Sequence, residues 1–139
     1  MCKKTLFGEN LKKYRKENNI SRSRIARKTG ISHRTLENIE YGISEPRYSD
    51  AKDIALYLGV SLSELCGYDV SEVEKFKSIP DFIRYYMRKC DFTNRERLSV
   101  KIGLSKPAIS NFIREKSEPK LNNIVTLLEV FGVGADKPI

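Results

Sequence analysis

The chain has few of the residues that build metal centres, disulfide frameworks or catalytic sites. Its 139 residues include three cysteines, one histidine and no tryptophan. A structural zinc site takes about four closely spaced cysteine or histidine ligands, and a disulfide framework takes paired cysteines in an oxidising compartment. Cys2, Cys66 and Cys90 fit neither pattern. We interpret them as reduced thiols, and we expect no metal and no cofactor.

Long apolar runs and catalytic groupings are scarce as well. No run approaches the roughly 20 apolar residues that cross a membrane. The charged start of the chain continues into Glu9 and Asn10 rather than into an apolar signal segment. No nucleophile and base stand in a recognisable pattern, and no glycine-rich phosphate loop follows a strand. We therefore expect a cytoplasmic protein that is not an enzyme and has no evident small-molecule ligand.

Positive charge is abundant and lies in two parts of the chain. The sequence has 26 Lys and Arg against 18 Asp and Glu, a net charge of +8. Residues 1–67 carry 13 against 8 and residues 79–139 carry 11 against 7, whereas the stretch between them is slightly acidic. Small basic domains favour a polyanionic partner such as nucleic acid, although charge also serves plain solubility.

The sequence also repeats itself. A shift of 73 positions lays residues 20–60 over residues 93–133 without a gap. Polar and apolar positions coincide: Ser44-Glu45-Pro46 with Ser117-Glu118-Pro119, Ile25 with Leu98, Leu36 with Ile109, and Ile54 with Leu127. Such a repeat indicates two similar domains in tandem. We predict a first unit at 1–67, a linker at 68–78 and a second, divergent unit at 79–139.

Helical spacing of apolar residues predicts an all-α fold for both units. In the first unit, helices are expected from Leu6 to Asn18 and over 22–28, 33–41, 48–58 and 62–66. In the second, Pro80 suits the first turn of a helix, and further helices are expected over 95–102, 106–114 and 121–131. No fifth helix is expected after the last of these. The linker contains a capping box at Ser71–Glu74, which predicts some helix there.

A motif of two short helices stands inside each unit. In the first, Ser21 caps one helix, Gly30 ends it and Ser32 caps the next. This is the pattern of a helix-turn-helix, whose second helix enters the major groove of DNA. Five residues should project outward from that helix: His33, Arg34, Glu37, Asn38 and Tyr41. Arginine can pair with guanine and asparagine with adenine.

These residues give the first unit a resemblance to the helix-turn-helix domain of the phage repressor and Cro family, of the xenobiotic-response-element type. The positions that carry it are Ile25-Ala26, Gly30-Ile31-Ser32, Leu36, Ile39-Glu40, Gly42, Glu45-Pro46, Ile54-Ala55, Leu58-Gly59-Val60 and Leu62. By position, the resemblance implies base contacts from Ser32, His33, Arg34 and Asn38, and phosphate contacts from Arg22 and Arg47. It also implies an ion pair between Arg15 and Glu40.

The second unit departs from this family pattern. Pro107 replaces Arg34, and apolar Met87 and Ile113 replace the Arg15–Glu40 pair, which avoids a lone buried charge. We still expect base contacts from Lys106 and Asn111, and the competing role for this unit is dimerisation in place of DNA contact. The expected phosphate contacts are completed by Arg24 in the first unit and by Arg95 and Lys120 in the second.

The function that we expect is sequence-specific binding of double-stranded DNA by a transcriptional regulator, a repressor from a bacterium, a phage or a mobile element. The alternative is a protein-interaction module on the same fold, such as an antirepressor or a phage-encoded inhibitor of a host enzyme. We expect a homodimer formed through the second unit, because a missing fifth helix would expose apolar surface near Leu127 and Phe131. The alternative assembly is a monomer whose two units bind tandem sites.

Overall fold

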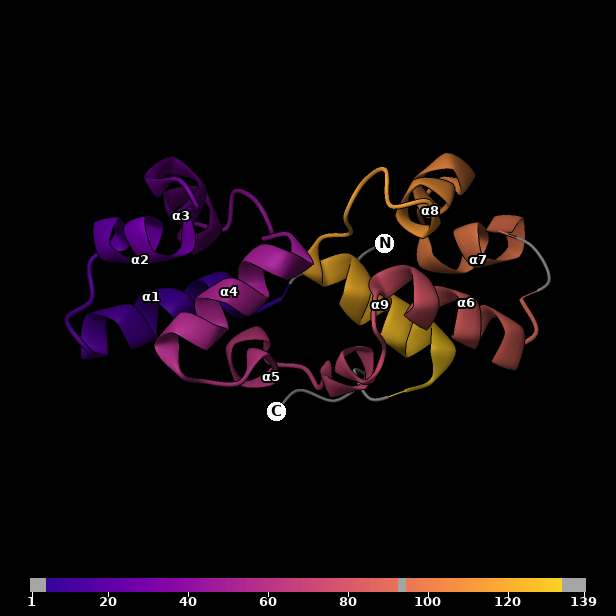
Figure 1. Cartoon of the computed structure of the whole chain (residues 1–139), viewed down its shortest axis with the longest axis horizontal. Helices are drawn as coiled ribbons and strands as arrows, with labels where there is room; N and C mark the ends of the chain where they lie inside the picture. Colours follow the sequence, from indigo (N-terminus) through magenta and orange to yellow (C-terminus); the bar gives the residue numbers. More distant parts are fainter. Residues whose placement is uncertain (1–4, 93–94, 134–139) are drawn as a thin grey trace.

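The computed structural model describes residues 5–92 and 95–133, except for the side chain of Arg95. These residues form nine α-helices and one 3-10 helix (Figure 1). In chain order they are α1 (Phe7–Glu17), α2 (Arg22–Thr29), α3 (His33–Glu40), α4 (Tyr48–Leu58), α5 (Leu62–Cys66), η1 (Ser71–Lys75), α6 (Ile79–Lys89), α7 (Arg95–Ile102), α8 (Lys106–Ile113) and α9 (Leu121–Phe131). The all-α fold expected from the sequence is confirmed.

Polar caps define the helix ends of the first helix-turn-helix. Ser21 Oγ accepts a hydrogen bond from the amide of Arg24 at 3.1 Å, which satisfies a free N–H at the start of α2. Gly30 ends α2 with φ of 80°, a left-handed conformation that costs glycine little. Ser32 Oγ then accepts from the amide of Thr35 at 3.1 Å. As predicted, α2 begins at Arg22 and α3 begins at His33.

A close approach between α1 and α3 sets the position of α3. A Cβ atom added to Gly8 would lie only 2.0 Å from the carbonyl oxygen of Ile39. The absence of a side chain at Gly8 therefore lets the two backbones come together. Phe7, Leu11 and Leu36 are fully buried around this approach and hold α3 by apolar packing.

The second unit repeats the order of the first with different side chains. Pro80 lies in the first turn of α6, as predicted. Ser105 Oγ accepts a hydrogen bond from the amide of Ala108 at 3.2 Å and caps α8, as Ser32 caps α3. In Figure 1, α3 and α8 occupy corresponding places along the upper edge, and α4 of the first unit meets α9 of the second near the middle of the molecule.

An aromatic cluster fills the core of the second unit. Tyr86 stacks on Phe131, with ring centroids 5.4 Å apart and planes at 22°. Phe82 contacts both of these rings edge-on, and Phe76 approaches Phe82 and Tyr86 from the segment before α6. Leu127 and Phe131 are only 1% and 6% exposed. The expectation of bare apolar surface at these two residues is wrong, and at Phe131 the rings of Phe82, Tyr86 and Phe92 account for the burial.

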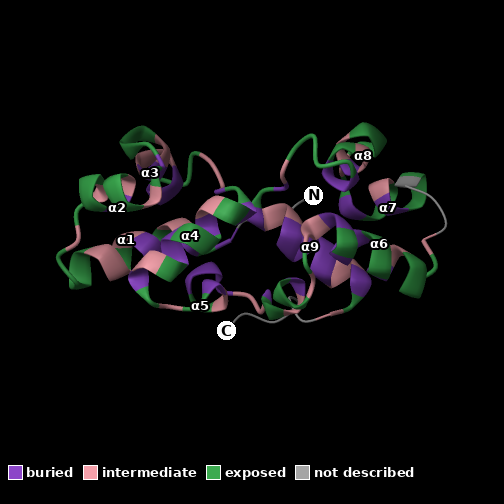
Figure 2. Ribbon diagram, in the orientation of Figure 1, coloured by how far each residue is buried: buried purple, intermediate pink, exposed green. Residues whose placement is uncertain are grey.

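The segment between the units is packed rather than extended. Val70 and Val73 are buried, and η1 confirms the helical turn predicted there. Buried side chains form one cluster from Phe7 to Phe131, so the apolar interior continues from one unit into the other (Figure 2). Residues 134–139, for which we expected no fifth helix, lie outside the described residues.

Candidate nucleic-acid interface

Helix α3 presents predicted base-reading side chains to solvent. His33 and Arg34 are exposed, and Asn38 is half-buried one turn later. The opposite face of α3 is fixed in the core by Leu36 and Ile39, which are 0% and 2% exposed. This arrangement gives α3 a rigid inner face and a polar outer face, as a helix in the major groove requires.

Ser32 is exposed at the start of α3, where its hydroxyl already serves as a cap. Besides accepting from the amide of Thr35, Ser32 Oγ donates to Thr35 Oγ1 at 2.8 Å. The side chain is therefore held in one orientation beside His33. Its contact with a base stays a prediction.

The predicted Arg15–Glu40 ion pair is present and links α1 to the end of α3. Arg15 Nε lies 2.7 Å from Glu40 Oε2, and Arg15 Nη2 donates to Glu40 Oε1 at 2.9 Å, so the pair is bidentate. The Glu40 side chain is fully buried. Burial opposes its ionisation, but the hydrogen bonds and charges of Arg15 and then Arg22 outweigh burial and hold the pKa of Glu40 below its ordinary value.

Arg22 joins this pair, which sequence reasoning missed. Its Nε atom lies 3.0 Å from Glu40 Oε1. Its guanidinium also lies over the ring of exposed Tyr41, 5.5 Å from the centroid. Lys12 approaches the same ring at 5.2 Å. Arg22 therefore stands at the predicted phosphate-binding end of α2, with part of its hydrogen-bonding capacity already used by Glu40. Its phosphate contact stays a prediction.

Helix α8 presents a different outer face in the second unit. Lys106, Pro107 and Asn111 are exposed, so the two predicted base-reading residues of this unit share one accessible helix. At the other end of α8, Ile113 is buried and its carbonyl oxygen accepts a hydrogen bond from Arg84 Nη2 at 3.1 Å. Apolar packing thus replaces the buried Glu40 of the first unit.

The predicted phosphate-contacting residues fall at two kinds of position. Arg24 is exposed in the first turn of α2, and the backbone of Arg95 begins α7, although its side chain lies outside the described part of the structure. Arg47 and Lys120 are exposed and face each other in an antiparallel bridge between the units. The sequence did not indicate this pairing, because the two residues belong to different units.

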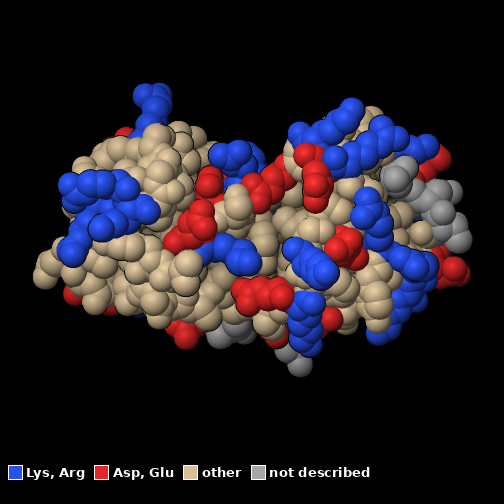
Figure 3. Space-filling view, in the orientation of Figure 1, with Lys and Arg blue, Asp and Glu red and all other residues tan. Residues whose placement is uncertain are grey.

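The charge distribution agrees with these placements. Lys and Arg gather over α2 at one end of the molecule and above α8 at the other, and a basic side chain projects above α3 (Figure 3). Asp and Glu lie mainly between these regions in the same view. Basic side chains therefore flank both helix-turn-helix motifs, where a polyanion would approach them.

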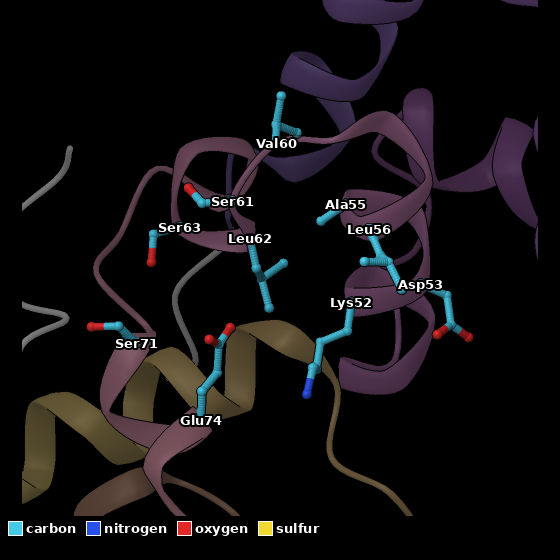
Figure 4. A pocket seen from close by; sticks show the side chains of 10 residues that line it. All are labelled: Lys52, Asp53, Ala55, Leu56, Val60, Ser61, Leu62, Ser63, Ser71 and Glu74. Atoms are coloured by element: carbon cyan, nitrogen blue, oxygen red, sulfur yellow. The ribbon is translucent and has the colours of Figure 1, made fainter.

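An open cavity of about 520 Å³ lies away from these helices, between α4, the start of α5 and η1 (Figure 4). Lys52, Leu56 and Glu74 are among its lining residues. Across residues 5–92 and 95–133, no group of three or more His, Cys, Asp or Glu could hold a metal ion. Within the same ranges, no helix has the length and apolar character to span a membrane.

Comparison with known proteins identifies both motifs. Residues 11–65 and 83–137 each match the model of the helix-turn-helix family. The chain is similar to a transcriptional regulator from Listeria innocua of known crystal structure, with 29% sequence identity and a TM-score of 0.44. The match covers 48% of this chain and 62% of that one. No curated protein matches the sequence.

Proposed function

The chain belongs to the helix-turn-helix family through both of its units, and from this premise we propose that it is a sequence-specific DNA-binding transcriptional regulator. The observation that carries the proposal is the outer face of α3. His33 and Arg34 are exposed there, on a helix whose inner face is buried and whose end is fixed by Glu40. A preorganised helix with guanidinium and imidazole groups can exchange hydrogen bonds with base edges.

The proposal includes repression as the mode of regulation and the cytoplasm of a bacterium as the place of action, with a bacterial, phage or mobile-element gene as the source. Support comes from the resemblance of the first unit to phage repressors and Cro. Repression needs only that the bound protein occupy DNA that a polymerase must use. Transcription in vitro from a promoter carrying the bound sequence, with and without the protein, tests this part separately.

A protein-interaction module on the same fold is the competing function. An apolar or acidic outer face would favour such a module, because the core of a protein interface is apolar and an acidic surface repels the phosphates of DNA. The outer face of α3 carries His33, Arg34 and Asn38. Its acidic Glu37 lies 3.8 Å from Arg22, whose guanidinium also covers the ring of Tyr41. Arg24 and Arg47, which we predict to contact phosphates, are also exposed, and this favours a nucleic-acid partner.

Selection of bound sequences from random duplex DNA tests the proposal directly. A defined consensus, bound more tightly than unrelated duplex, is the expected result. Binding should weaken steeply with salt, because each phosphate contact adds about 0.9 to the slope of log affinity against log salt concentration. Equal affinity for every duplex, or affinity that does not depend on salt, would contradict sequence-specific DNA binding.

A further inference from the structure

The loops before α4 and α9 join the two units through a reciprocal pair of backbone hydrogen bonds. The amide of Tyr48 donates to the carbonyl oxygen of Pro119 at 3.1 Å, and the amide of Leu121 donates to that of Pro46 at 2.8 Å. The repeat of 73 residues carries Pro46 onto Pro119 and Tyr48 onto Leu121. Exchanging the units therefore exchanges the two bonds. A contact that maps onto itself in this way is isologous and implies a local two-fold axis.

The surroundings of this axis are buried. Pro46 and Pro119 are buried, Tyr48 is 6% exposed and Leu121 is 0% exposed. Helices α4 and α9, which begin at these loops, contact each other directly. Apolar packing around the paired backbones therefore orients one unit against the other, in contrast to two domains on a free tether.

Glu118 of the second unit adds side-chain hydrogen bonds to this junction. The carboxylate of Glu118 accepts hydrogen bonds from the amide and the hydroxyl of Ser49, at 2.9 and 2.7 Å. It thus caps the start of α4 across the junction. Glu45, the counterpart of Glu118, binds Thr5 of its own unit instead, with Thr5 Oγ1 at 2.7 Å from Glu45 Oε1. The two-fold relation is therefore close in the backbone and unequal in the side chains.

The axis brings the recognition helices to the same side of the molecule. Figure 1 shows α3 and α8 along one edge, with the α4–α9 junction between them. Two helices related by a two-fold axis meet the two strands of a duplex in opposite directions. Their half-sites must then be inverted relative to each other, because a direct repeat would present the second half-site backwards to α8.

We propose that a single chain binds one operator made of two inverted half-sites of different sequence, one read by α3 and the other by α8. The proposal rests on the DNA-binding function proposed above. The half-sites differ because α3 offers Arg34 where α8 has Pro107, whose side chain has no hydrogen-bond donor. The shared asparagines, Asn38 and Asn111, make adenine the base that both halves can have in common.

The internal two-fold relation supplies within one chain what a homodimer would supply with two. The apolar surface on which the homodimer expectation depended is absent at Leu127 and Phe131, which are buried. The stoichiometry of the complex with DNA distinguishes the two assemblies. The free protein should have the 16.0 kDa mass of one chain at micromolar concentration.

The test uses the full-length chain and the consensus duplex obtained by selection. Light scattering of the purified complex should give one chain per duplex, and the consensus should contain two inverted, dissimilar halves. Inserting five base pairs between the halves rotates one of them by about half a helical turn. Because the two units are fixed relative to each other, only one of them can then bind its half-site. The insertion should therefore reduce affinity by about 100-fold or more, to the affinity for a single half-site.

Protein variants assign each half to its helix. Arg34→Ala should relax base preference in one half and Asn111→Ala in the other, each with a loss of about 10-fold in affinity for the consensus. A complex of two chains on one palindrome, a consensus of direct repeats, or full affinity after the insertion would overturn the single-chain proposal and leave DNA binding intact. Failure to select any consensus would overturn both.

Discussion

Arg15 and Glu40 form a bidentate ion pair, with Arg15 Nε 2.7 Å from Glu40 Oε2, and this pair ties the first helix of the chain to the end of the recognition helix. The carboxylate is fully buried and also accepts from Arg22. In the second unit the corresponding residues are Met87 and Ile113, and the helix end is held by apolar packing. The two units thus hold the same helix end in different ways, the first by an ion pair and the second by apolar packing.

The first prediction concerns Glu40. Glu40→Ala leaves two arginines facing a buried space, so it should lower the free energy of unfolding by about 3–5 kcal/mol. The double variant Arg15→Met with Glu40→Ile, which copies the second unit, should recover part of this loss. Urea unfolding measures both, with Arg34→Ala, an exposed change on the same helix, as the control. Equal instability of the single and double variants would contradict the packing argument.

The same pair predicts how stability depends on pH. The pKa of Glu40 is lowered from 4.5 in the folded protein, so its stabilising contribution is complete above that value. It is lost as the pH falls below 4.5 through the lowered pKa, because the folded state must then take up a proton that the unfolded state already holds. The double variant should lose less stability over this range than the original chain.

The second prediction concerns the approach of α1 to α3. Alanine is favoured over glycine in a helix by about 1 kcal/mol. At Gly8 the steric clash should outweigh this helix preference, because the added Cβ would lie 2.0 Å from the backbone oxygen of Ile39. Gly8→Ala should therefore destabilise the protein, by about 1–3 kcal/mol on the scale of overpacked cores. Thermal unfolding against Lys13→Ala, an exposed change on the same helix, checks the sign.

The third prediction is that the units contribute unequally to base recognition. Arg34→Ala should cost about 1–3 kcal/mol of specific binding and relax the preference at one base pair, because arginine can pair with two acceptors of guanine. Lys106→Ala should weaken all sequences about equally, since a lysine acts as a point charge. Titrations against the operator and its single-base variants measure both. A change of base preference with Lys106→Ala but not with Arg34→Ala would contradict this prediction and show that the second unit reads the bases.

The fourth prediction concerns Tyr48 at the junction of the units. Its hydroxyl is buried and, among the described residues, has no hydrogen-bond partner. Tyr48→Phe removes this polar group and should raise the free energy of unfolding by about 1 kcal/mol. Urea unfolding at neutral pH measures the difference, and Tyr57→Phe on the same helix is the matched control. A loss of stability in Tyr48→Phe alone would show that the hydroxyl is satisfied.

The ionisation of Tyr48 gives the fourth prediction a second readout. Burial, and then the charge of Glu74, raise the pKa of Tyr48 from 10.0 to about 12. The folded state therefore keeps a proton that the unfolded state loses, and stability falls as the pH rises from 10 toward 12. The Tyr48→Phe variant should lose less stability than the original chain over this range, although Tyr86, whose pKa is also raised to about 12, still contributes.

Local chemistry allowed the sequence alone to determine the helices and which face of α3 turns outward. Ser21, Gly30 and Ser32 act on backbone groups within a few residues of themselves, and the period of Leu36 and Ile39 decides which face of α3 turns inward. The Arg15–Glu40 pair followed from a family pattern. None of these inferences needed to know how distant segments meet.

Only the tertiary structure decided how the two units are joined. The bonds of Tyr48 to Pro119 and of Leu121 to Pro46 use backbone groups, which every residue offers and no sequence pattern marks. The burial of Phe131 likewise depends on aromatic side chains that lie far from it in the sequence, Phe82 and Tyr86 of α6 and Phe92 after that helix. The sequence specified two helix-turn-helix units through short-range capping and periodicity. The long-range pairing of their loops turned them into one body with two recognition helices on the same side.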